Sequence, residues 1–310
     1  METAVLGRTG IRVSRLCFGS LPFSPLQRDC DPEEAGALLA EAFALGVNFV
    51  DTAQLYRNYA HIRAGLSRAK GPVAVASKTY AHTGALCRAA VEETRRGLDR
   101  DVIDIFLLHE QESEHTLRGH AAALEYLYAC KARGTVRAVG LSTHQAAGVD
   151  AAVSAGLDIV HPLLNFKGMG LRGGLADMEK AILRAGAAGL GVYTMKALGG
   201  GALYKDAAAA LTYALRWGGS TALGIRCREE LLDDVYFFTH GRFPDRPAAA
   251  PGAARRLWIA GWCTGCGLCA GHCPSGALSI SNDRAMCDRT RCVLCGYCAG
   301  HCPDLCVKLI

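Results

Sequence analysis

The stretch DPEEAGALLAEAFALGVNFVDTAQLY (residues 31–56) contains a helix and the strand that follows it. Asp31 is a typical N-cap, Pro32 suits the first helical position, and Gly46 suits the residue just past the helix end. The apolar run after Gly46 is short, which is typical of a buried strand. This unit of helix and strand predicts an α/β fold.

Strand-like runs of the same kind recur along the first 224 residues, at intervals of 23 to 33 residues. They begin at Leu16, Val47, Val73, Ile103, Val136, Ile159, Gly191 and Thr221. Eight near-equal strand–helix units predict a (β/α)8 TIM barrel. An open doubly wound sheet is the alternative, but the spacing shows no reversal point. The lead-in AVLGRTGIRVSRL (residues 4–16) predicts a hairpin beneath the barrel.

The chain divides into three parts by composition. The barrel pattern occupies residues 1–240 and ends with the helix-like REELLDDVYFFTH (residues 228–240). Residues 241–256 are rich in Pro, Gly and Ala, which is typical of a linker. Residues 257–310 predict a small α+β domain, because ten of the fifteen cysteines lie in the last 48 residues and short strand-like runs flank them.

These cysteines form a repeat with an offset of 29 residues, and CAGHCP is identical in both copies. Three cysteines at spacing three, followed by Cys-Pro, are typical of a [4Fe–4S] ligand set in which the cysteine before proline binds the other cluster. The spacing thus predicts two clusters, one bound by Cys263, Cys266, Cys269 and Cys302, the other by Cys292, Cys295, Cys298 and Cys273. Structural zinc is the alternative, but zinc usually takes separated cysteine pairs.

The tail resembles the bacterial two-[4Fe–4S] ferredoxins over about residues 257–310. Cys287 and Cys306 fall outside the repeat, so we expect them to be free or packed thiols. His272 and His301 stand beside cluster ligands, and we expect them to be exposed.

The remaining composition narrows the class of protein. The formal charge of +5 comes without a stripe of Lys and Arg, so we expect no nucleic-acid partner. No apolar stretch is long enough for a membrane span, and no leader-like apolar segment opens the chain. An odd number of cysteines without such a leader indicates reduced thiols and a cytoplasmic location.

Four side chains gather where three neighbouring strands are expected to end. Asp51, Lys78 and His109 end the second, third and fourth strands, and Tyr56 follows Asp51 by one short loop. Barrel active sites are built at this rim. A lysine beside a tyrosine is expected to lower the tyrosine pKa, a carboxylate can hold the lysine, and a histidine can bind a substrate oxygen. Each residue alone has a structural explanation, but the four together predict a catalytic site.

Residues 1–240 resemble the aldo-keto reductase family, through motifs such as VLGRTGIRVSRLCFGS, VDTAQLY, LLHE, VRAVGLSTH, TMKALGGG and TALGIRCREEL. The resemblance implies that Tyr56 is the acid, that Lys78 and Asp51 tune it, and that His109 orients the carbonyl. It also implies hydride transfer between NAD(P)H and an aldehyde or ketone. The implied dinucleotide contacts are Ser142 and Asn165 at the nicotinamide and Gly199, Gly200, Gly201, Arg226 and Arg228 at the phosphates, with NADP favoured.

The sequence departs from the family pattern at several of these positions. Cys227 and Asp234 stand where the family commonly has Ser and Asn, and Met195 stands where many members have an aromatic residue. His161 replaces a common Gln. The segment GMGLRG (residues 168–173) fits G-x-G-x-x-G, but no acidic residue follows about twenty positions on, so it predicts a loop or helix entry.

The whole chain resembles ferredoxin-fused aldo-keto reductases of anaerobic prokaryotes. This implies an iron–sulfur oxidoreductase that acts on a small carbonyl or alcohol, with clusters that pass electrons and a redox protein as partner. Nicotinamide gives two electrons as hydride, whereas each cluster passes one at a time, and no flavin motif bridges them. Two alternatives stay open: an electron-transfer subunit in which the barrel mainly docks, and clusters that are structural or redox-sensing.

Overall fold

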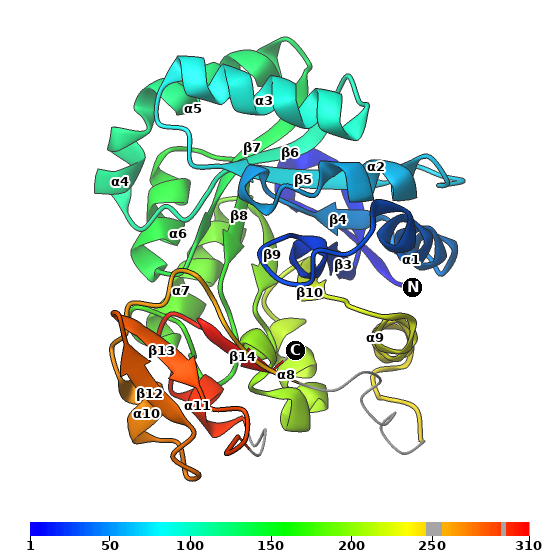
Figure 1. The fold of residues 1–310 in the computed structure, drawn as a ribbon. Coiled ribbons are helices and arrows are strands. Elements are labelled where there is room, and N and C mark those ends of the chain that lie inside the picture. Colours follow the sequence, from blue (N-terminus) through cyan, green and yellow to red (C-terminus); the bar gives the residue numbers. More distant parts are fainter. Residues whose placement is uncertain (246–255, 293–295, 310) are drawn as a thin grey trace.

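A computed structural model describes residues 1–245, 256–292 and 296–309, and Figure 1 shows its fold. Eight parallel strands close into a barrel in which each strand neighbours the next in sequence, and the last pairs with the first. The predicted TIM barrel is therefore confirmed. Its strands are β3 (Leu16–Gly19), β4 (Phe49–Asp51), β5 (Ala74–Thr79), β6 (Ile103–Leu108), β7 (Val136–Thr143), β8 (Ile159–Pro162), β9 (Gly191–Met195) and β10 (Ser220–Gly224).

Helices surround the barrel and bury one face each against the strands (Figure 1). The stretch quoted first behaves as predicted, since the Asp31 carboxylate accepts hydrogen bonds from the backbone N–H of Glu33 and Glu34 and caps the first helix. The helices are α1 (Pro32–Ala44), α2 (Tyr59–Leu66), α3 (Gly84–Leu98), α4 (Glu114–Gly119), α5 (Ala121–Ala132), α6 (Ala146–Ser154), α7 (Leu175–Ala187), α8 (Ala207–Ala214) and α9 (Arg228–His240).

The barrel is filled from within and closed at one end. Strands β1 (Thr3–Val5) and β2 (Arg12–Ser14) form the predicted antiparallel hairpin, and the backbone N–H of Arg8 binds the carbonyl of Gly189 just before β9. Apolar side chains from the hairpin and the strands pack together inside, among them Leu6, Phe49 and Tyr193. The interior is thus a packed core, and chemistry is left to the rim where the strands end.

The stretch LRGHAAALEYLYACKARG (residues 117–134) has helical apolar spacing and a terminal Gly134, which predicts one helix. The structure instead divides it at His120, where α4 ends and α5 begins. His120 has a non-helical backbone, and its ring Nδ1 lies 2.9 Å from the Thr116 carbonyl oxygen. This side-chain contact competes with the next helical hydrogen bond and ends the first helix.

The chain after the barrel forms a small α+β unit. Strand β11 (Leu257–Ile259) pairs with β14 (Val307–Leu309), and β12 (Leu278–Ser281) pairs with β13 (Arg284–Cys287). Helices α10 (Leu268–Gly271) and α11 (Tyr297–Gly300) each follow a glycine with φ of +81°, and they stand 29 residues apart as the sequence repeat predicts. Most of the predicted linker, residues 246–255, lies outside the described residues.

This small domain packs on the strand ends of the barrel, beside β8 and β9 (Figure 1). Strand β14 and helix α11 contact the short helix η4 (Gly199–Gly201), which follows β9. The contact places a cysteine-rich unit beside the rim where the predicted catalytic residues end their strands. In the described ranges, no helix is long and apolar enough to cross a membrane.

Candidate functional site

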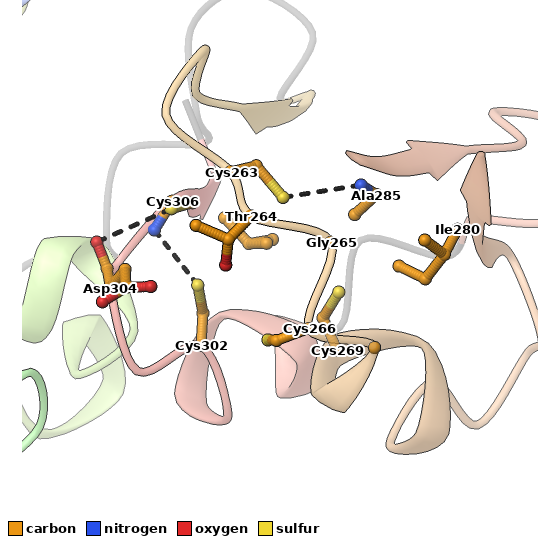
Figure 2. A pocket seen from close by; sticks show the side chains of 12 residues that line it. Cys263, Thr264, Gly265, Cys266, Cys269, Ile280, Ala285, Cys302, Asp304 and Cys306 are labelled. Carbon is orange, nitrogen blue, oxygen red and sulfur yellow. Dashed lines mark hydrogen bonds between the residues drawn. The ribbon is translucent and has the colours of Figure 1, made fainter. Parts of the chain in front are cut away.

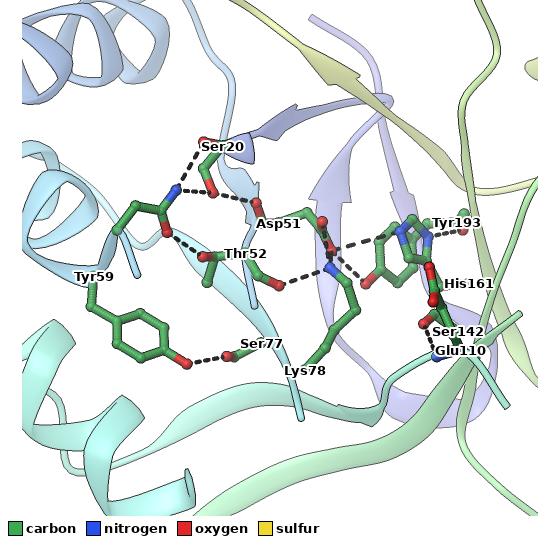
Figure 3. A network of polar contacts seen from close by, with 11 residues as sticks. Ser20, Asp51, Thr52, Tyr59, Ser77, Lys78, Glu110, Ser142, His161 and Tyr193 are labelled. Atoms are coloured by element: carbon green, nitrogen blue, oxygen red, sulfur yellow. Dashed lines mark hydrogen bonds and ion pairs between the residues drawn. The ribbon is translucent and has the colours of Figure 1, made fainter. Parts of the chain in front are cut away.

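A buried ion pair lies at the centre of the rim (Figure 3). The Lys78 Nζ donates to both oxygens of Asp51, at 2.6 and 2.7 Å, and to the Thr52 carbonyl at 2.7 Å. Lys78 is 1% exposed and Asp51 is 5% exposed. All three donor positions of the ammonium are therefore used, and the charge is fixed in place in a low-dielectric site.

Two further side chains complete the surroundings of Asp51, and neither has a role there in the pattern of the sequence. The Tyr193 hydroxyl donates to Asp51 at 2.9 Å, and the His161 Nε2 lies 3.7 Å from the same carboxylate. The rings of His161 and Tyr193 stack with centroids 3.8 Å apart. Burial lowers the pKa of His161 to about 4, so its ring is neutral near pH 7. An aromatic residue with a polar tip at an inward position of β9 is the sequence signal that could have revealed Tyr193.

Tyr56 lies above this pair. Its ring centroid is 5.3 Å from the Lys78 Nζ and 6.1 Å from the His109 ring centroid, in an edge-on arrangement. Burial and the negative charges of Asp51 and Glu110 raise the pKa of Tyr56 well above its ordinary value. The direction is opposite to the expected lowering by Lys78, because burial disfavours the charged phenolate and the Asp51 carboxylate beside the ammonium acts in the same direction. Tyr56 is thus kept as a protonated phenol.

His109 has a ring nitrogen without a hydrogen-bond partner among the described residues. Its ring stacks on Tyr80 with centroids 4.4 Å apart, and the Tyr80 hydroxyl in turn donates to Glu110 at 2.6 Å. The His109 Nδ1 is buried, and it has no hydrogen-bond partner among the residues that the structure describes. Burial and nearby Lys78 lower the pKa of His109, which keeps the ring neutral. A neutral imidazole ring beside a phenol suits the binding of a substrate oxygen.

The two residues expected at a nicotinamide are held by the protein itself. The Ser142 hydroxyl accepts a hydrogen bond from the Glu110 backbone N–H at 2.9 Å. The Asn165 side-chain oxygen accepts from the backbone N–H groups of Lys167 and Met169. The Asn165 amide nitrogen donates to the carbonyls of Met169 and Lys196. Both lone pairs and both N–H groups of Asn165 are therefore used to shape the loop that it belongs to.

The residues expected at the dinucleotide phosphates also have other partners. Arg226 is paired through its guanidinium and its backbone N–H with Glu230, one turn further along α9. The Arg228 Nε lies 2.8 Å from Glu41 on α1. Gly200 and Gly201 lie against the small domain, with β14 beside them. The structure brings the predicted phosphate-binding residues to one side of the rim. The charges of Arg226 and Arg228 are already paired with carboxylates there.

Two positions at which the sequence departs from the family pattern, Cys227 and Asp234, lie next to or in α9. Burial and the nearby carboxylates of Glu230 and Asp233 raise the pKa of Asp234 well above its ordinary value. Cys227 is the N-cap residue of α9, and its thiol lies near Glu229 and Glu230.

In the small domain, five cysteines line one pocket (Figure 2). Four of them, Cys263, Cys266, Cys269 and Cys302, are the set that the repeat predicts for one cluster, and the fifth is Cys306. Cys302 comes from the second copy of the repeat, so the cavity joins both halves. The backbone N–H groups of Ala285 and Cys306 point at Cys263 and Cys302, at 3.4 and 3.1 Å from the sulfurs. Such N–H groups favour thiolates and tune cluster potentials.

The second predicted ligand set is described in part. Cys295 lies outside the described residues. Cys273 accepts a hydrogen bond from the Ala277 backbone N–H at 3.3 Å, and Cys292 and Cys287 are hydrogen-bonded to each other. Across the repeat, His272 and His301 are both exposed, and their rings stack at 3.7 Å. In the described ranges, no three His, Cys, Asp or Glu side chains converge closely enough to hold a single metal ion.

Comparison with known proteins assigns the family. The model of the aldo/keto reductase family matches residues 15–216. The chain belongs to the aldo/keto reductase family. A 4Fe–4S binding domain matches residues 257–279, so this aldo-keto reductase carries an iron–sulfur domain after its barrel. The chain is therefore an oxidoreductase of this family with a ferredoxin-like domain, as the sequence resemblance predicts.

Individual relatives agree with this assignment. The chain is 27% identical over 154 residues to L-galactose dehydrogenase of Arabidopsis thaliana, covering 46% of this chain and 48% of that protein. It is 46% identical over 56 residues to the oxidoreductase YrpG of Bacillus subtilis (strain 168), covering 18% of this chain and 16% of that one. The chain thus spans less than half the length of each of these curated relatives.

Solved structures share the barrel. A Pseudomonas aeruginosa protein described as an aldo-keto reductase superposes with a TM-score of 0.66 at 25% identity, covering 77% of this chain and 95% of that one. The holo form of an aldo-keto reductase from Bacillus halodurans superposes with a TM-score of 0.64 at 18% identity, covering 79% and 92%. The latter likeness concerns the fold alone.

Proposed function

We propose that this aldo-keto reductase interconverts a small carbonyl compound and its alcohol at Tyr56, Lys78, Asp51 and His109. We further propose that residues 257–310 form a domain with two [4Fe–4S] clusters that exchange single electrons with a redox protein. The observation that carries the catalytic proposal is the buried Lys78–Asp51 pair beneath a protonated Tyr56, beside a His109 nitrogen without a partner. Family membership gives this arrangement its reaction class.

The side chains support a division of labour in proton transfer. Tyr56 keeps its proton near neutral pH, so its hydroxyl is available to donate to a carbonyl oxygen. The His109 ring is neutral, and its free nitrogen can orient the same oxygen by a hydrogen bond. As Tyr56 gives up its proton, the phenolate that forms lies near the Lys78 ammonium, which stabilises it.

The residues around the cavity in the small domain suit an iron–sulfur cluster. Four cysteine sulfurs face one cavity, and backbone N–H groups approach two of them. A cluster bound there would supply one-electron transfer. The second cluster, with ligands Cys292, Cys295, Cys298 and Cys273, follows from the repeat. NADP(H) stays a prediction for the barrel, since the residues expected to bind it have other partners.

The catalytic proposal is tested by the variant Tyr56→Phe in an anaerobic assay on a panel of aldehydes, ketones and alcohols. The matched control is Tyr128→Phe, which removes a hydroxyl that binds the Ala155 carbonyl on the outer surface. We expect Tyr56→Phe to lose about 10²-fold or more in kcat, because general acid catalysis contributes at least that much. Equal turnover by both variants would overturn the proposal.

A further inference from the structure

The small domain docks on the barrel through one leucine. Leu305 lies in the loop between Cys302 and Cys306, and it is 2% exposed. A Cβ built on Gly170 would lie 2.8 Å from the Leu305 Cδ1, so the Leu305 side chain fills a hollow that only glycine leaves open. Leu305 has a φ of +50°, a strained conformation for leucine that persists only where packing holds it. Gly170 belongs to the GMGLRG segment (residues 168–173), which therefore receives the Leu305 side chain.

The same loop continues over the glycines that follow β9. Positions for a Cβ on Gly200 lie 3.8 Å from the Leu305 Cβ and 3.9 Å from the Lys308 Cε. A Cβ on Gly201 would lie 3.7 Å from the Leu309 carbonyl oxygen. Strand β14 therefore lies on η4 within van der Waals contact, where the family resemblance would place a phosphate.

Charged and aromatic groups hold the domain in this position. Arg172 lies 2.8 Å from Glu112 on the barrel rim and 3.7 Å from Asp304 of the small domain. Lys308 is 9% exposed, and its Nζ lies 5.5 Å from the ring centroids of both Trp258 and Trp262. All three residues belong to the small domain, so this contact fixes β14 within that domain, whereas the Arg172–Asp304 pair crosses to the barrel.

The residues expected to bind a dinucleotide are therefore unavailable at three places. Asn165 uses all of its hydrogen-bonding groups in its own loop and with Lys196. Gly200 and Gly201 lie under β14. The guanidinium of Arg226 is neutralised by Glu230. A nicotinamide dinucleotide does not fit these residues as the structure arranges them.

We propose that the ferredoxin-like domain takes the place of a nicotinamide dinucleotide in this chain and delivers electrons to the barrel site through the cluster bound by Cys263, Cys266, Cys269 and Cys302. The proposal rests on the proposed carbonyl chemistry at Tyr56. Its basis is that the loop after the ligand Cys302 lies on the barrel rim, where Leu305 approaches Gly170 and Gly200. We call the cluster with this ligand the proximal one.

Polar side chains connect the docked loop to the catalytic residues. The Lys196 Nζ lies 3.1 Å from the His144 Nε2, and that ring nitrogen lies 3.7 Å from Glu110. Lys196 also feels the charges of Cys306 and Asp304 in the small domain. Glu110 follows His109 directly in the chain. Lys196, His144 and Glu110 thus lie in a row that leads from the side of the docked loop to the residue beside His109.

The reaction balances without hydride. A carbonyl gains two electrons and two protons to become an alcohol: the C=O π bond breaks, an O–H bond forms with the Tyr56 proton, and a C–H bond forms with a proton from water. Clusters held by the two predicted cysteine sets would supply the two electrons, one from each, and would end oxidised. A low-potential one-electron donor protein reduces them again. Because electrons arrive singly, the substrate needs a conjugated carbonyl that can spread an unpaired electron.

The experiment uses the anaerobically purified full-length holoprotein. Its clusters are reduced with dithionite, the excess is removed, and 1-phenyl-1,2-propanedione is added as the probe. We expect the absorbance near about 400 nm to recover with one hydroxyketone formed per two clusters. Equilibrium dialysis should show no saturable NADPH binding up to about 1 mM, the upper end of ordinary KM values. Micromolar NADPH binding, with deuterium passed from labelled NADPH to the product, would overturn the inference while leaving the proposed function intact.

The docking is tested by Gly170→Leu against Gly173→Leu. Both glycines have a positive φ, but only Gly170 faces Leu305, since nothing lies within 4 Å of a Cβ on Gly173. We expect Gly170→Leu to slow cluster reoxidation by the probe about tenfold or more at unchanged iron content, because misplaced groups cost large factors in rate. Equal rates for the two variants overturn the docking.

A second variant tests the same contact if Gly170→Leu fails to fold or to bind iron. Leu305→Gly removes the same contact from the other partner, at a φ that glycine adopts without strain. A slowed reoxidation supports the proposal, and a wild-type rate overturns it. If Tyr56→Phe reoxidises its clusters as fast as wild type, the catalytic proposal fails, whereas the dialysis result still decides the absence of a dinucleotide.

Discussion

The barrel site and the cysteine-lined pocket of the small domain are organised in different ways. At the barrel rim, Lys78 and Asp51 are held by direct hydrogen bonds within the protein, and the site has its geometry without any bound group. In the ferredoxin-like domain, the four proximal cysteines instead face a cavity. Four cysteine side chains around one pocket are the arrangement that binds an iron–sulfur cluster. The barrel is preorganised by its own chain, whereas the small domain depends on what it binds.

The difference follows from size and composition. The barrel buries a large continuous core between strands and helices, with a second core inside the strands. The small domain has one core, in which cysteines take much of the space. A unit this small rarely gains enough stability from apolar burial alone. We propose that metal ligation that links residues from both repeats supplies part of its folding free energy.

Removing cluster ligands should produce the largest effect, and it also tests whether the ligands cross between repeats. In a Cys306→Ala background, we expect Cys266→Ala and Cys302→Ala each to lower the iron content from about eight to about four. The background is needed because the Cys306 backbone lies 3.1 Å from the Cys302 sulfur, so its thiol is close enough to replace a ligand. Iron analysis of anaerobic protein is the measurement.

The double variant decides between the two pairings. If Cys266 and Cys302 bind the same cluster, the variant lacking both keeps about four irons, since the second cluster is untouched. If each repeat binds its own cluster, the double variant loses both, and the crossed pairing is wrong. Stoichiometric zinc without iron in the wild-type protein would instead contradict the iron–sulfur assignment altogether.

The sequence predicted the elements well where local signals were strong. Helices α1 and α9 have the bounds that Asp31, Pro32 and the REELLDDVYFFTH segment indicate. The break at His120 was missed, because a side-chain contact to Thr116 outweighs continuous helical spacing. The contact between Leu305 and Gly170 lies beyond sequence reasoning, because it joins loops 135 residues apart whose separate patterns say nothing of each other.

Breaking the ion pair of the barrel should have the next largest effect. Lys78→Met leaves the Asp51 carboxylate buried without its cation, and we expect the free energy of barrel unfolding to fall by about 3–5 kcal/mol. The control is Lys131→Met, which breaks an equally short pair with Asp158 where the lysine is 41% exposed. That variant should lose about 1 kcal/mol or less. Denaturant unfolding followed by circular dichroism measures both.

A second change separates charge from packing. Lys78→Met combined with Asp51→Leu removes both charges, so we expect it to recover part of the loss. If the single and double variants are equally unstable, the site is held by packing rather than by the ion pair, and the contrast with the small domain weakens.

The catalytic site was predicted in part. The types and rim positions of Asp51, Lys78 and His109 follow from their places at the ends of expected strands. The direction of the Tyr56 pKa shift does not follow from the sequence. It depends on how deeply the ring is buried and on the carboxylate to which Lys78 is already bound. Tyr193 was missed for a related reason: an inward-facing residue in a strand can be told from an outward one only when the closure of the barrel is known.

The smallest predicted effect is a dependence of barrel stability on pH. His161 is buried with a folded pKa of about 4, whereas its unfolded value is about 6.5. Between these two pKa values the His161 ring is protonated in the unfolded chain but neutral in the folded barrel. Stability is therefore complete above about pH 6.5 and falls as the pH drops toward 4, by about 3 kcal/mol from this group. Burial is the main cause, while Asp51 favours the charged ring and Lys78 and Lys196 oppose it.

The variant His161→Gln keeps a polar side chain but removes this titration. Denaturant unfolding at several pH values between 4 and 7 should give a shallower slope for the variant than for wild type. His109 and His144 also have lowered pKa values, so part of the slope remains in the variant. An unchanged slope would mean that water reaches the His161 ring. The barrel site would then be less rigidly preorganised than its hydrogen bonds indicate, and closer in character to the cluster cavity.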